Sequence, residues 1–221
     1  MTENIKAYVF DAYGTLFDVY SVFEEVEDIF PDKGEEISQL WRQKQIEYSF
    51  IRELIGRYRP FSQVTKEALQ FACEQAGVSL NKEQEIRLMK KYNELTLYPE
   101  VKDVLHQLNP KQKAIFSNGS SDMLNPLIER YSLMNDLDSL ITADLRKFYK
   151  PVPASYMTVI ETLHVKRENV LFMSSNSWDI IGAKSFGFNT AWINRGGKVM
   201  DKLGIDPDFV YKDLTGILDH V

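Results

Sequence analysis

The feature that most constrains the fold of this 221-residue chain is the alternation of short, apolar, β-rich runs with stretches of helical periodicity. The apolar runs are Ile5–Phe10, Lys113–Ser117, Val170–Ser174, Thr190–Asn194 and Asp208–Tyr211. Strands that alternate with helices predict a parallel sheet covered on both faces, which is a doubly wound α/β fold. Ligands bind such sheets at the carboxyl ends of the strands, so the residues that follow each run are candidates for a functional site.

The segment from residue 19 to residue 98 breaks this alternation. It contains no convincing strand, and its apolar residues are spaced as on one face of a helix, for example at Val64 and Ala68. We therefore predict two domains. Residues 1–18 and 99–221 form a Rossmann-like core domain, and residues 19–98 form an inserted, all-helical cap domain above the end of the first strand.

Composition and charge exclude several classes of protein. The net charge of −6 argues against nucleic acid as a partner, because phosphate binding normally requires a basic surface. The apolar run at Ala7–Phe10 is too short for a signal-peptide core or a membrane span, so we expect a cytoplasmic protein without a membrane partner. The single cysteine, Cys73, excludes an internal disulfide, and its apolar, helical surroundings favour a buried structural thiol.

Histidine chemistry is also disfavoured. His106, His164 and His220 lie in helix-like or terminal segments, with no second histidine or carboxylate at metal-ligand spacing. We expect surface or boundary positions for them. General-base catalysis by histidine and histidine-ligated metals therefore become less probable.

Polar residues follow the first two strands of the predicted core. Asp11 ends the first strand where a nucleophile would stand, and Gly14 allows a tight turn, although a capping or turn aspartate is common at such places. Ser117 and Asn118 follow the second strand at a glycine turn, where they could cradle a carboxylate or a phosphate. A helix N-cap explains Ser120 or Ser121 equally well but does not explain Asn118.

Two further motifs follow later in the chain. Lys150 precedes Pro151, which we expect to start the helix that contains Tyr156. A lone lysine is usually a solvated side chain. The polar run Ser174–Asp179 directly follows a very apolar strand, which favours a functional site there. Capping of the next helix by Asn176 or Ser177 is the alternative explanation. A solvated loop does not explain an acid so close to a buried strand.

In this order, Asp11, Ser117, Lys150 and Asp179 resemble the four motifs of the haloacid dehalogenase superfamily. Its phosphatases carry a second aspartate two residues after the nucleophile, as general acid and base, whereas this chain has Tyr13 there. A tyrosine hydroxyl, with a reference pKa of about 10, is a poor substitute for that carboxylate. Phosphoryl transfer also requires a metal, and with Tyr13 in place of the second aspartate the site has one acid fewer.

The chain is instead similar to the L-2-haloacid dehalogenases. Phe10–Leu16 resembles their opening motif, and Trp41–Phe50 resembles their first cap helix, in which the arginine, here Arg42, faces the active site. The alternative is a surface arginine on an amphipathic helix. The resemblance continues through Ser174–Asp179, Phe186–Phe188 and Trp192–Arg195, and it departs at Ile46 and Phe50, where leucine and tryptophan are expected. These departures bear on substrate size rather than on chemistry.

The resemblance implies hydrolysis of L-2-haloacids to D-2-hydroxyacids, with inversion, through an ester on Asp11 and without a metal or cofactor. It also implies a homodimer. The residues implied in catalysis are Asp11, Thr15, Arg42, Ser117, Lys150, Tyr156, Ser174, Asn176 and Asp179. Those implied in substrate binding are Tyr13, Arg42, Gln43, Ile46, Phe61, Ser117, Asn118 and Trp178.

In the roles implied, Lys150 keeps Asp11 ionised, and Ser117 and Asn118 grip the substrate carboxylate. Arg42 draws off the halide. Asp179 orients or deprotonates the hydrolytic water, with Ser174 and Asn176 positioning it and Thr15 steadying the Asp11 loop.

Three alternatives stay open at this point. One is a magnesium-dependent phosphatase of the same superfamily, with Asp179 and the Tyr13 carbonyl as metal ligands; Tyr13 is the feature against it. The second is a dehalogenase that prefers haloacetate or another halogenated acid. The third is a catalytically silent binding protein, which is disfavoured by the joint presence of Asp11, Arg42, Ser117, Lys150 and Asp179.

Overall fold

The computed structural model describes residues 4–108 and 110–220, and the chain divides into two compact units. The first, the sheet unit, comprises the chain up to Phe17, Leu97–Asn118 and the chain from Ser132 onward. The second, the helical unit, comprises Asp18–Thr96 and Gly119–Tyr131. This division groups residues 119–131 with the helical unit, where the predicted cap ended at residue 98. Whether residues 19–98 act as a cap over the core stays a prediction.

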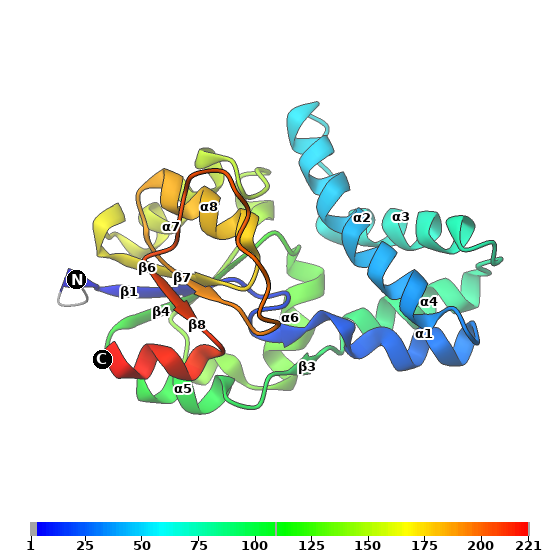
Figure 1. Cartoon of the computed structure of the whole chain (residues 1–221), viewed down its shortest axis with the longest axis horizontal. Coiled ribbons are helices and arrows are strands. Elements are labelled where there is room, and N and C mark those ends of the chain that lie inside the picture. Colours follow the sequence, from blue (N-terminus) through cyan, green and yellow to red (C-terminus); the bar gives the residue numbers. More distant parts are fainter. Residues whose placement is uncertain (1–3, 109, 221) are drawn as a thin grey trace. The chain divides into compact units, whose positions relative to one another are not determined.

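The sheet unit contains a six-stranded sheet in the order β5-β4-β1-β6-β7-β8, and every neighbouring pair is parallel (Figure 1). Its strands are β1 (Ala7–Phe10), β4 (Gln112–Ser117), β5 (Ser139–Thr142), β6 (Val170–Ser174), β7 (Asn189–Ile193) and β8 (Phe209–Tyr211). In the register, Val9 of β1 lies opposite Ala114 of β4 and Phe172 of β6. The continuous apolar runs arise because β1, β4 and β6 are buried on both faces.

The five predicted strands match observed strands to within two residues, which confirms the doubly wound α/β prediction. Strand β5 was not predicted, because it is short, lies at the sheet edge and has only two apolar residues, Leu140 and Ile141. A separate two-stranded sheet pairs β2 (Phe17–Asp18) with β3 (Thr96–Leu97), and strands of two residues leave no periodicity to detect.

Helices cover both faces of the six-stranded sheet. In Figure 1, α7 (Pro153–Leu163) and α8 (Ser177–Phe186) lie on one face, and α5 (Val101–Gln107) and the short helix η6 (Leu214–His220) lie on the other. The remaining short helices of this unit are η3 (Leu133–Asn135), η4 (Ala143–Leu145) and η5 (Arg167–Asn169). Val9, Phe172 and Phe186 belong to the core cluster under α7 and α8, and each fully buried side chain of this kind contributes roughly 1.5–3 kcal/mol.

The start of α7 corrects a prediction. The helix begins at Pro153 and not at Pro151, because Val152 precedes a proline and is held in an extended conformation, with φ −68° and ψ 142°.

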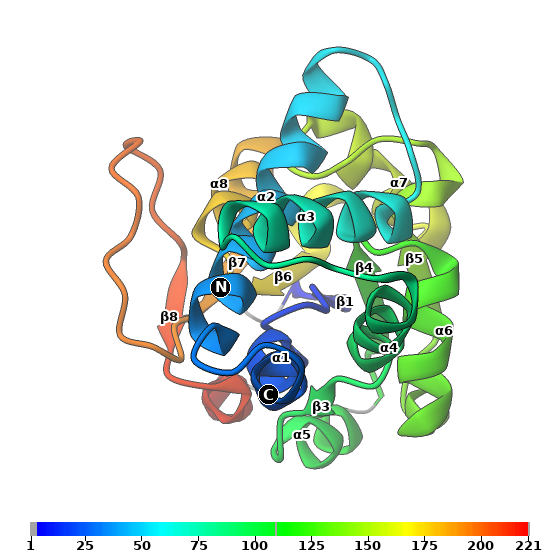
Figure 2. The ribbon, with the colours of Figure 1, turned by 90° about the vertical axis from the view of Figure 1, so that its right-hand side faces the viewer.

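The helical unit consists of η2 (Val19–Val22), α1 (Phe23–Ile29), α2 (Gly34–Leu54), α3 (Phe61–Gln75), α4 (Lys82–Tyr92) and α6 (Ser121–Arg130). Figure 2 shows α2 and α3 crossing each other. Trp41 anchors this crossing: it is fully buried, and its indole N–H donates to the Thr65 carbonyl at 2.8 Å. None of the described helices combines the length and the apolar character that a membrane crossing requires.

The cysteine and two of the histidines lie where the sequence predicts. Cys73 is buried in α3, and burial raises the pKa of its thiol to about 11, as expected of a structural thiol. His106 and His164 are exposed, and the side chain of His220 lies outside the part of the structure that is described. Within the described residues, no group of three or more histidine, cysteine, aspartate or glutamate side chains could hold a metal ion.

Candidate active site

Asp11 leaves the carboxyl end of β1 on a tight turn. Its backbone N–H donates to the carbonyl of Met173 in β6 at 2.8 Å, so the turn starts from a fixed point in the sheet. Gly14 has a φ of +88°, and a Cβ at this position would stand 2.9 Å from the hydroxyl of Ser175. Only glycine suits this conformation and this close approach. The turn therefore directs a carboxylate that is only 4% exposed to the sheet's carboxyl edge.

The two oxygens of Asp11 have different partners. Oδ1 accepts a hydrogen bond from Nζ of Lys150 at 2.9 Å. Oδ2 accepts from the Thr15 hydroxyl at 3.0 Å, from Nδ2 of Asn176 at 2.9 Å and from the Ser174 hydroxyl at 3.4 Å. One oxygen thus faces a cation, and the other lies among neutral donors.

Lys150 bridges two carboxylates in the interior. Its fully buried Nζ also lies 2.6 Å from Oδ2 of Asp179 and donates to the Phe116 carbonyl at 3.1 Å. Burial by itself lowers the pKa of this ammonium, but the charges of Asp11 and Asp179 outweigh that effect, and the pKa is raised. Lys150 is therefore a permanent cation at neutral pH.

Asp179 is the fully buried acid of the site. Its Oδ1 accepts the hydroxyl of Tyr156 at 2.7 Å, and its Oδ2 accepts Lys150. Burial raises the pKa of Asp179 to about 6, with Lys150 opposing the shift and Asp11 adding to it. Burial, followed by the charge of Asp179, raises the pKa of Tyr156 well above its usual value, so the phenol stays protonated and donates.

The side chain of Asn118 makes a contact that the sequence did not indicate. Its Oδ1 accepts the Lys150 backbone N–H at 2.7 Å, and its Nδ2 donates to the Lys150 carbonyl at 3.1 Å. The amide therefore brackets the backbone of the lysine. The substrate contact predicted for Asn118 stays a prediction beside these two bonds.

The other predicted residues of the sheet unit lie at the same edge. Ser117 is fully buried at the end of β4, and Trp178 is half-buried in the first turn of α8. Tyr13 is buried, and its carbonyl accepts Nδ2 of Asn176 at 3.3 Å.

The capping alternatives account for positions but not for contacts. Ser120 and Asn176 occupy the N-cap positions of α6 and α8, yet neither side chain caps its helix. The Ser120 hydroxyl accepts the Ser62 backbone N–H at 3.1 Å, and the amide of Asn176 donates to Asp11.

Arg42, Gln43, Ile46 and Phe61 belong to the helical unit. Arg42 and Ile46 are half-buried on α2, Gln43 is exposed, and Phe61 is buried at the first position of α3. Their contribution to the chemistry at Asp11 stays a prediction.

Sequence reasoning missed Gln45, which is fully buried three residues after Arg42. Its Oε1 accepts the Tyr92 hydroxyl at 2.8 Å and lies 3.5 Å from Nη1 of Arg42, and its Nε2 donates to the Thr65 hydroxyl at 3.2 Å. The available signal was a glutamine on the core-facing side of an amphipathic helix.

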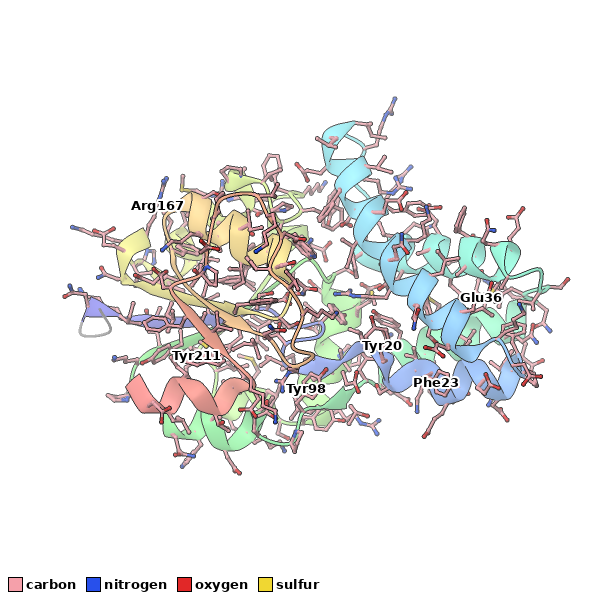
Figure 3. All side chains as sticks on the ribbon, in the orientation of Figure 1. Tyr20, Phe23, Glu36, Tyr98, Arg167 and Tyr211 are labelled. Carbon is pink, nitrogen blue, oxygen red and sulfur yellow. The ribbon has the colours of Figure 1, made fainter. Side chains whose placement is uncertain are left out.

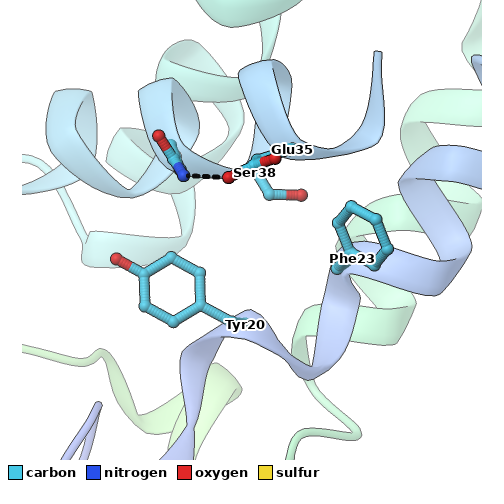
Figure 4. A pocket seen from close by; sticks show the side chains of 5 residues that line it. Tyr20, Phe23, Glu35 and Ser38 are labelled. Carbon is cyan, nitrogen blue, oxygen red and sulfur yellow. Dashed lines mark hydrogen bonds between the residues drawn. The ribbon is translucent and has the colours of Figure 1, made fainter. Parts of the chain in front are cut away.

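The helical unit also contains a cavity of about 370 Å³ lined by Tyr20, Phe23, Glu35, Ser38 and Gln39 (Figure 4). None of these is a predicted site residue. Nε2 of Gln39 donates to Glu35 at 2.9 Å, which is the dashed line in Figure 4.

A carboxylate follows β1 of the parallel sheet, and a lysine lies between this carboxylate and a second acid. This arrangement is typical of hydrolases that use a carboxylate as nucleophile. The family model of the haloacid dehalogenase-like hydrolases matches residues 5–187.

Individual relatives narrow the class. Haloacetate dehalogenase H-2 of Moraxella sp. (strain B) is 39% identical over 98% of this chain and 97% of its own length. The (S)-2-haloacid dehalogenase of Pseudomonas sp. (strain YL) is 40% identical over 98% of this chain and 94% of its own length. The solved L-2-haloacid dehalogenase from Xanthobacter autotrophicus with chloropropionic acid covalently bound has a TM-score of 0.88 and 39% identity, covering 97% of this chain and 96% of that one. The chain therefore belongs to the L-2-haloacid dehalogenase family of these hydrolases.

Proposed function

We propose that this enzyme hydrolyses L-2-haloacids to D-2-hydroxyacids and halide, with inversion at carbon 2, through an ester on Asp11. The observation that carries the proposal is the environment of Asp11, a buried carboxylate that pairs with a buried lysine through one oxygen and is fixed by three neutral donors on the other. A carboxylate fixed in this orientation can act as a nucleophile in covalent catalysis. The relatives named for this reaction, and the solved relative with a covalently bound acid, support it.

In the first step, Oδ1 of Asp11 attacks carbon 2 from the side opposite the halogen. The carbon–halogen bond breaks, its electron pair leaves with the halide, and an ester forms with inverted configuration. Oδ1 is the attacking atom because Oδ2 is held by Thr15, Asn176 and Ser174. No metal takes part, since the ammonium of Lys150 supplies the positive charge.

In the second step, water attacks Cγ of Asp11. Oδ2 is now the ester carbonyl oxygen, and the three donors around it stabilise the negative charge that develops there. Asp179 accepts the proton of the water, for which a pKa of about 6 is suitable near neutral pH. The bond between Cγ and Oδ1 breaks, and the leaving alkoxide takes the proton held by Asp179, so that the hydroxyacid departs with Oδ1. Asp11 keeps the oxygen of the water and releases the remaining proton to solvent.

The substrate contacts complete the proposal. Ser117 and Asn118, with nearby backbone N–H groups, bind the substrate carboxylate, and Arg42 binds the departing halide. The residues proposed to surround the halide and the alkyl group are Tyr13, Gln43, Ile46, Phe61 and Trp178. Residues 19–98 are proposed to act as the cap that supplies Arg42.

The phosphatase alternative would use Asp179 and the Tyr13 carbonyl as metal ligands. In this chain, Asp179 accepts hydrogen bonds from Lys150 and Tyr156 on its two oxygens, and the Tyr13 carbonyl accepts one from Asn176. These groups are thus engaged with cationic or neutral donors, which favours dehalogenation. A silent binding protein would not need the ion pairs that join Asp11, Lys150 and Asp179.

The test is halide release from the separate enantiomers of 2-chloropropionate and from chloroacetate, with and without a chelator. Hydrolysis of an aryl phosphate with magnesium is measured alongside. We expect chelator-insensitive halide release from the L enantiomer only. Metal-dependent phosphate release without halide would establish the phosphatase, and activity on chloroacetate alone would establish a haloacetate-preferring enzyme.

We further propose that the enzyme is a cytoplasmic homodimer with neither nucleic acid nor membrane as a partner. Support for the dimer comes from apolar side chains at the end of α2, where Ile51, Leu54 and Ile55 are 43%, 84% and 61% exposed. A second copy of the chain would cover them. Light scattering should give twice the chain mass, and Leu54→Glu should shift the protein towards the monomer.

A further inference from the structure

Arg195 lies just after β7, and its guanidinium joins two segments that are distant in sequence. Nη2 donates to the Thr15 carbonyl at 2.8 Å and to Oε1 of Glu100 at 2.6 Å. The guanidinium also stacks over the ring of Tyr98, labelled in Figure 3, at 3.7 Å from the ring centre. The Arg195 and Glu100 side chains are 18% and 14% exposed, so this ion pair is more protected from water than a surface pair.

The Thr15 carbonyl belongs to the turn that carries the nucleophile. The Thr15 backbone N–H donates to Ala12 at 3.2 Å, and the Thr15 hydroxyl donates to Oδ2 of Asp11 at 3.0 Å. The same hydroxyl accepts the Ser175 backbone N–H at 2.8 Å. A shift of the Thr15 peptide would therefore also displace the hydrogen bond between the Thr15 hydroxyl and the reacting carboxylate.

The segment around Tyr98 is tied to the same turn. The Tyr98 backbone N–H donates to the Leu16 carbonyl at 2.9 Å, one residue after Thr15. Arg195 thus contacts the turn directly through Thr15 and contacts its neighbouring segment through Glu100 and the Tyr98 ring. The backbone of Arg195 is itself fixed, because the preceding Asn194 N–H donates to Tyr211 at 2.8 Å.

We propose that Arg195 is a positioning residue, which together with Glu100 holds Thr15 so that its hydroxyl remains on Oδ2 of Asp11. The proposal rests on the function proposed above, in which Oδ2 is the ester carbonyl oxygen during hydrolysis. Loss of the clamp should slow hydrolysis of the ester without changing substrate binding. The wild-type enzyme would then be faster in this step than any variant whose Thr15 peptide is released.

The first test compares Arg195→Gln with the wild type on L-2-chloropropionate. We expect kcat to fall by about tenfold or more with KM within about twofold, since misplacement of a reacting group by about 1 Å can cost about a hundredfold in rate. Quenched intact-protein mass spectrometry should show a larger fraction of the enzyme as the Asp11 ester. Arg195→Lys should restore only part of kcat, because an ammonium cannot reproduce the planar fork and the stacking.

A double-mutant cycle separates positioning from general stability. Thr15→Val removes the hydroxyl through which Arg195 acts, so adding Arg195→Gln to it should cause little further loss in the rate of ester hydrolysis. Single-turnover mass spectrometry follows this rate even in slow variants. The matched control is Arg146→Gln, which removes the exposed Arg146–Glu161 ion pair of the same unit and should leave kcat unchanged.

Three results would overturn the proposal: a folded Arg195→Gln enzyme with wild-type kcat, a loss that is fully additive with that of Thr15→Val, or a rise in KM alone. If Arg195→Gln fails to fold, Glu100→Gln or Arg195→Lys takes its place in the double-mutant cycle with Thr15→Val. Absence of halide release from the wild-type protein would instead overturn the proposed function, so the two failures are distinguishable.

Discussion

Nζ of Lys150 lies 2.6 Å from a carboxylate oxygen of Asp179, and both side chains are fully buried. Because Lys150 also pairs with Asp11, one buried cation serves two buried carboxylates. Two ionised acids then leave a net negative charge in a medium that solvates it poorly. This imbalance explains why the acid with no exposed surface, Asp179, has the raised pKa.

The first prediction concerns the pH dependence of turnover. Asp179 must be ionised to accept a proton from water, and its pKa is raised to about 6. We expect kcat to fall tenfold per pH unit below about pH 6, with a plateau above it. A profile of kcat at saturating L-2-chloropropionate checks this, and a plateau that continues down to pH 4 would contradict the role of Asp179 as the base.

The same group predicts an opposite trend for stability. Between its usual pKa of 3.8 and the raised value of about 6, the folded protein binds more protons than the unfolded chain. The contribution of Asp179 to the free energy of unfolding therefore decreases as pH rises through this window. In Asp179→Asn this pH-dependent component should vanish, and the free energy of unfolding above pH 6 should not be lowered. Denaturant titrations at pH 5 and pH 7 on both proteins measure the difference.

Asp179→Asn should also stop the reaction at the ester. The amide cannot take a proton from water, whereas Lys150 and the donors on Oδ2 still support attack by Asp11. We expect one halide per active site and a stable mass increase on the peptide that contains Asp11. Continued multiple turnover at more than about a hundredth of the wild-type rate would exclude Asp179 as the general base.

Gly182 provides a test of the contact between Tyr156 and Asp179. A Cβ at this position would stand 2.5 Å from the Tyr156 hydroxyl and 2.5 Å from Cβ of Pro151. Gly182→Ala should cost about 1–3 kcal/mol of stability by overpacking. It should also lower kcat, because Tyr156 must move away from Asp179.

The control for that substitution is Gly196→Ala, whose Cβ would meet only Lys198 at an ordinary 3.6 Å. Adding Tyr156→Phe to Gly182→Ala removes the clashing hydroxyl and should recover part of the stability but none of the activity. Thermal melts and kcat values for the four proteins distinguish these effects. Equal stability of Gly182→Ala and wild type would show that the local packing can yield.

That Asp11, Lys150 and Asp179 lie together could be predicted from the sequence for a physical reason. Asp11, Ser117, Lys150 and Asp179 each follow an apolar run or precede a fixed turn, and a parallel sheet brings the carboxyl ends of its strands to one edge. The doubly wound fold therefore follows from local pattern alone. Strand β5 escaped prediction because its burial comes from pairing with β4 and not from its own composition.

The missed contacts depend on pairs that no local pattern records. Arg195 and the Thr15 carbonyl are 180 residues apart, and Asn118 and the Lys150 backbone are 32 residues apart. In both cases a side chain binds a backbone group. Because the partner residue's own side chain takes no part in the contact, its residue type gives no signal of it in the sequence. The two bonds between the Asn118 amide and the Lys150 backbone could therefore not be predicted from the sequence.

The last prediction concerns Gln45, which fixes the surroundings of Arg42 inside the helical unit. Gln45→Leu keeps the volume but leaves the buried Tyr92 hydroxyl without the acceptor it has at 2.8 Å, at a cost of about 1–3 kcal/mol. Adding Tyr92→Phe should recover most of that stability. The exposed Gln39→Leu on the same helix is the control and should be neutral.

If Arg42 draws off the halide, a misplaced guanidinium matters more for a poor leaving group. We therefore expect Gln45→Leu to slow turnover of L-2-chloropropionate several-fold more than turnover of the bromo acid. An unchanged ratio of the two kcat values, in a protein with the expected loss of stability, would show that Gln45 supports the helical unit without setting Arg42.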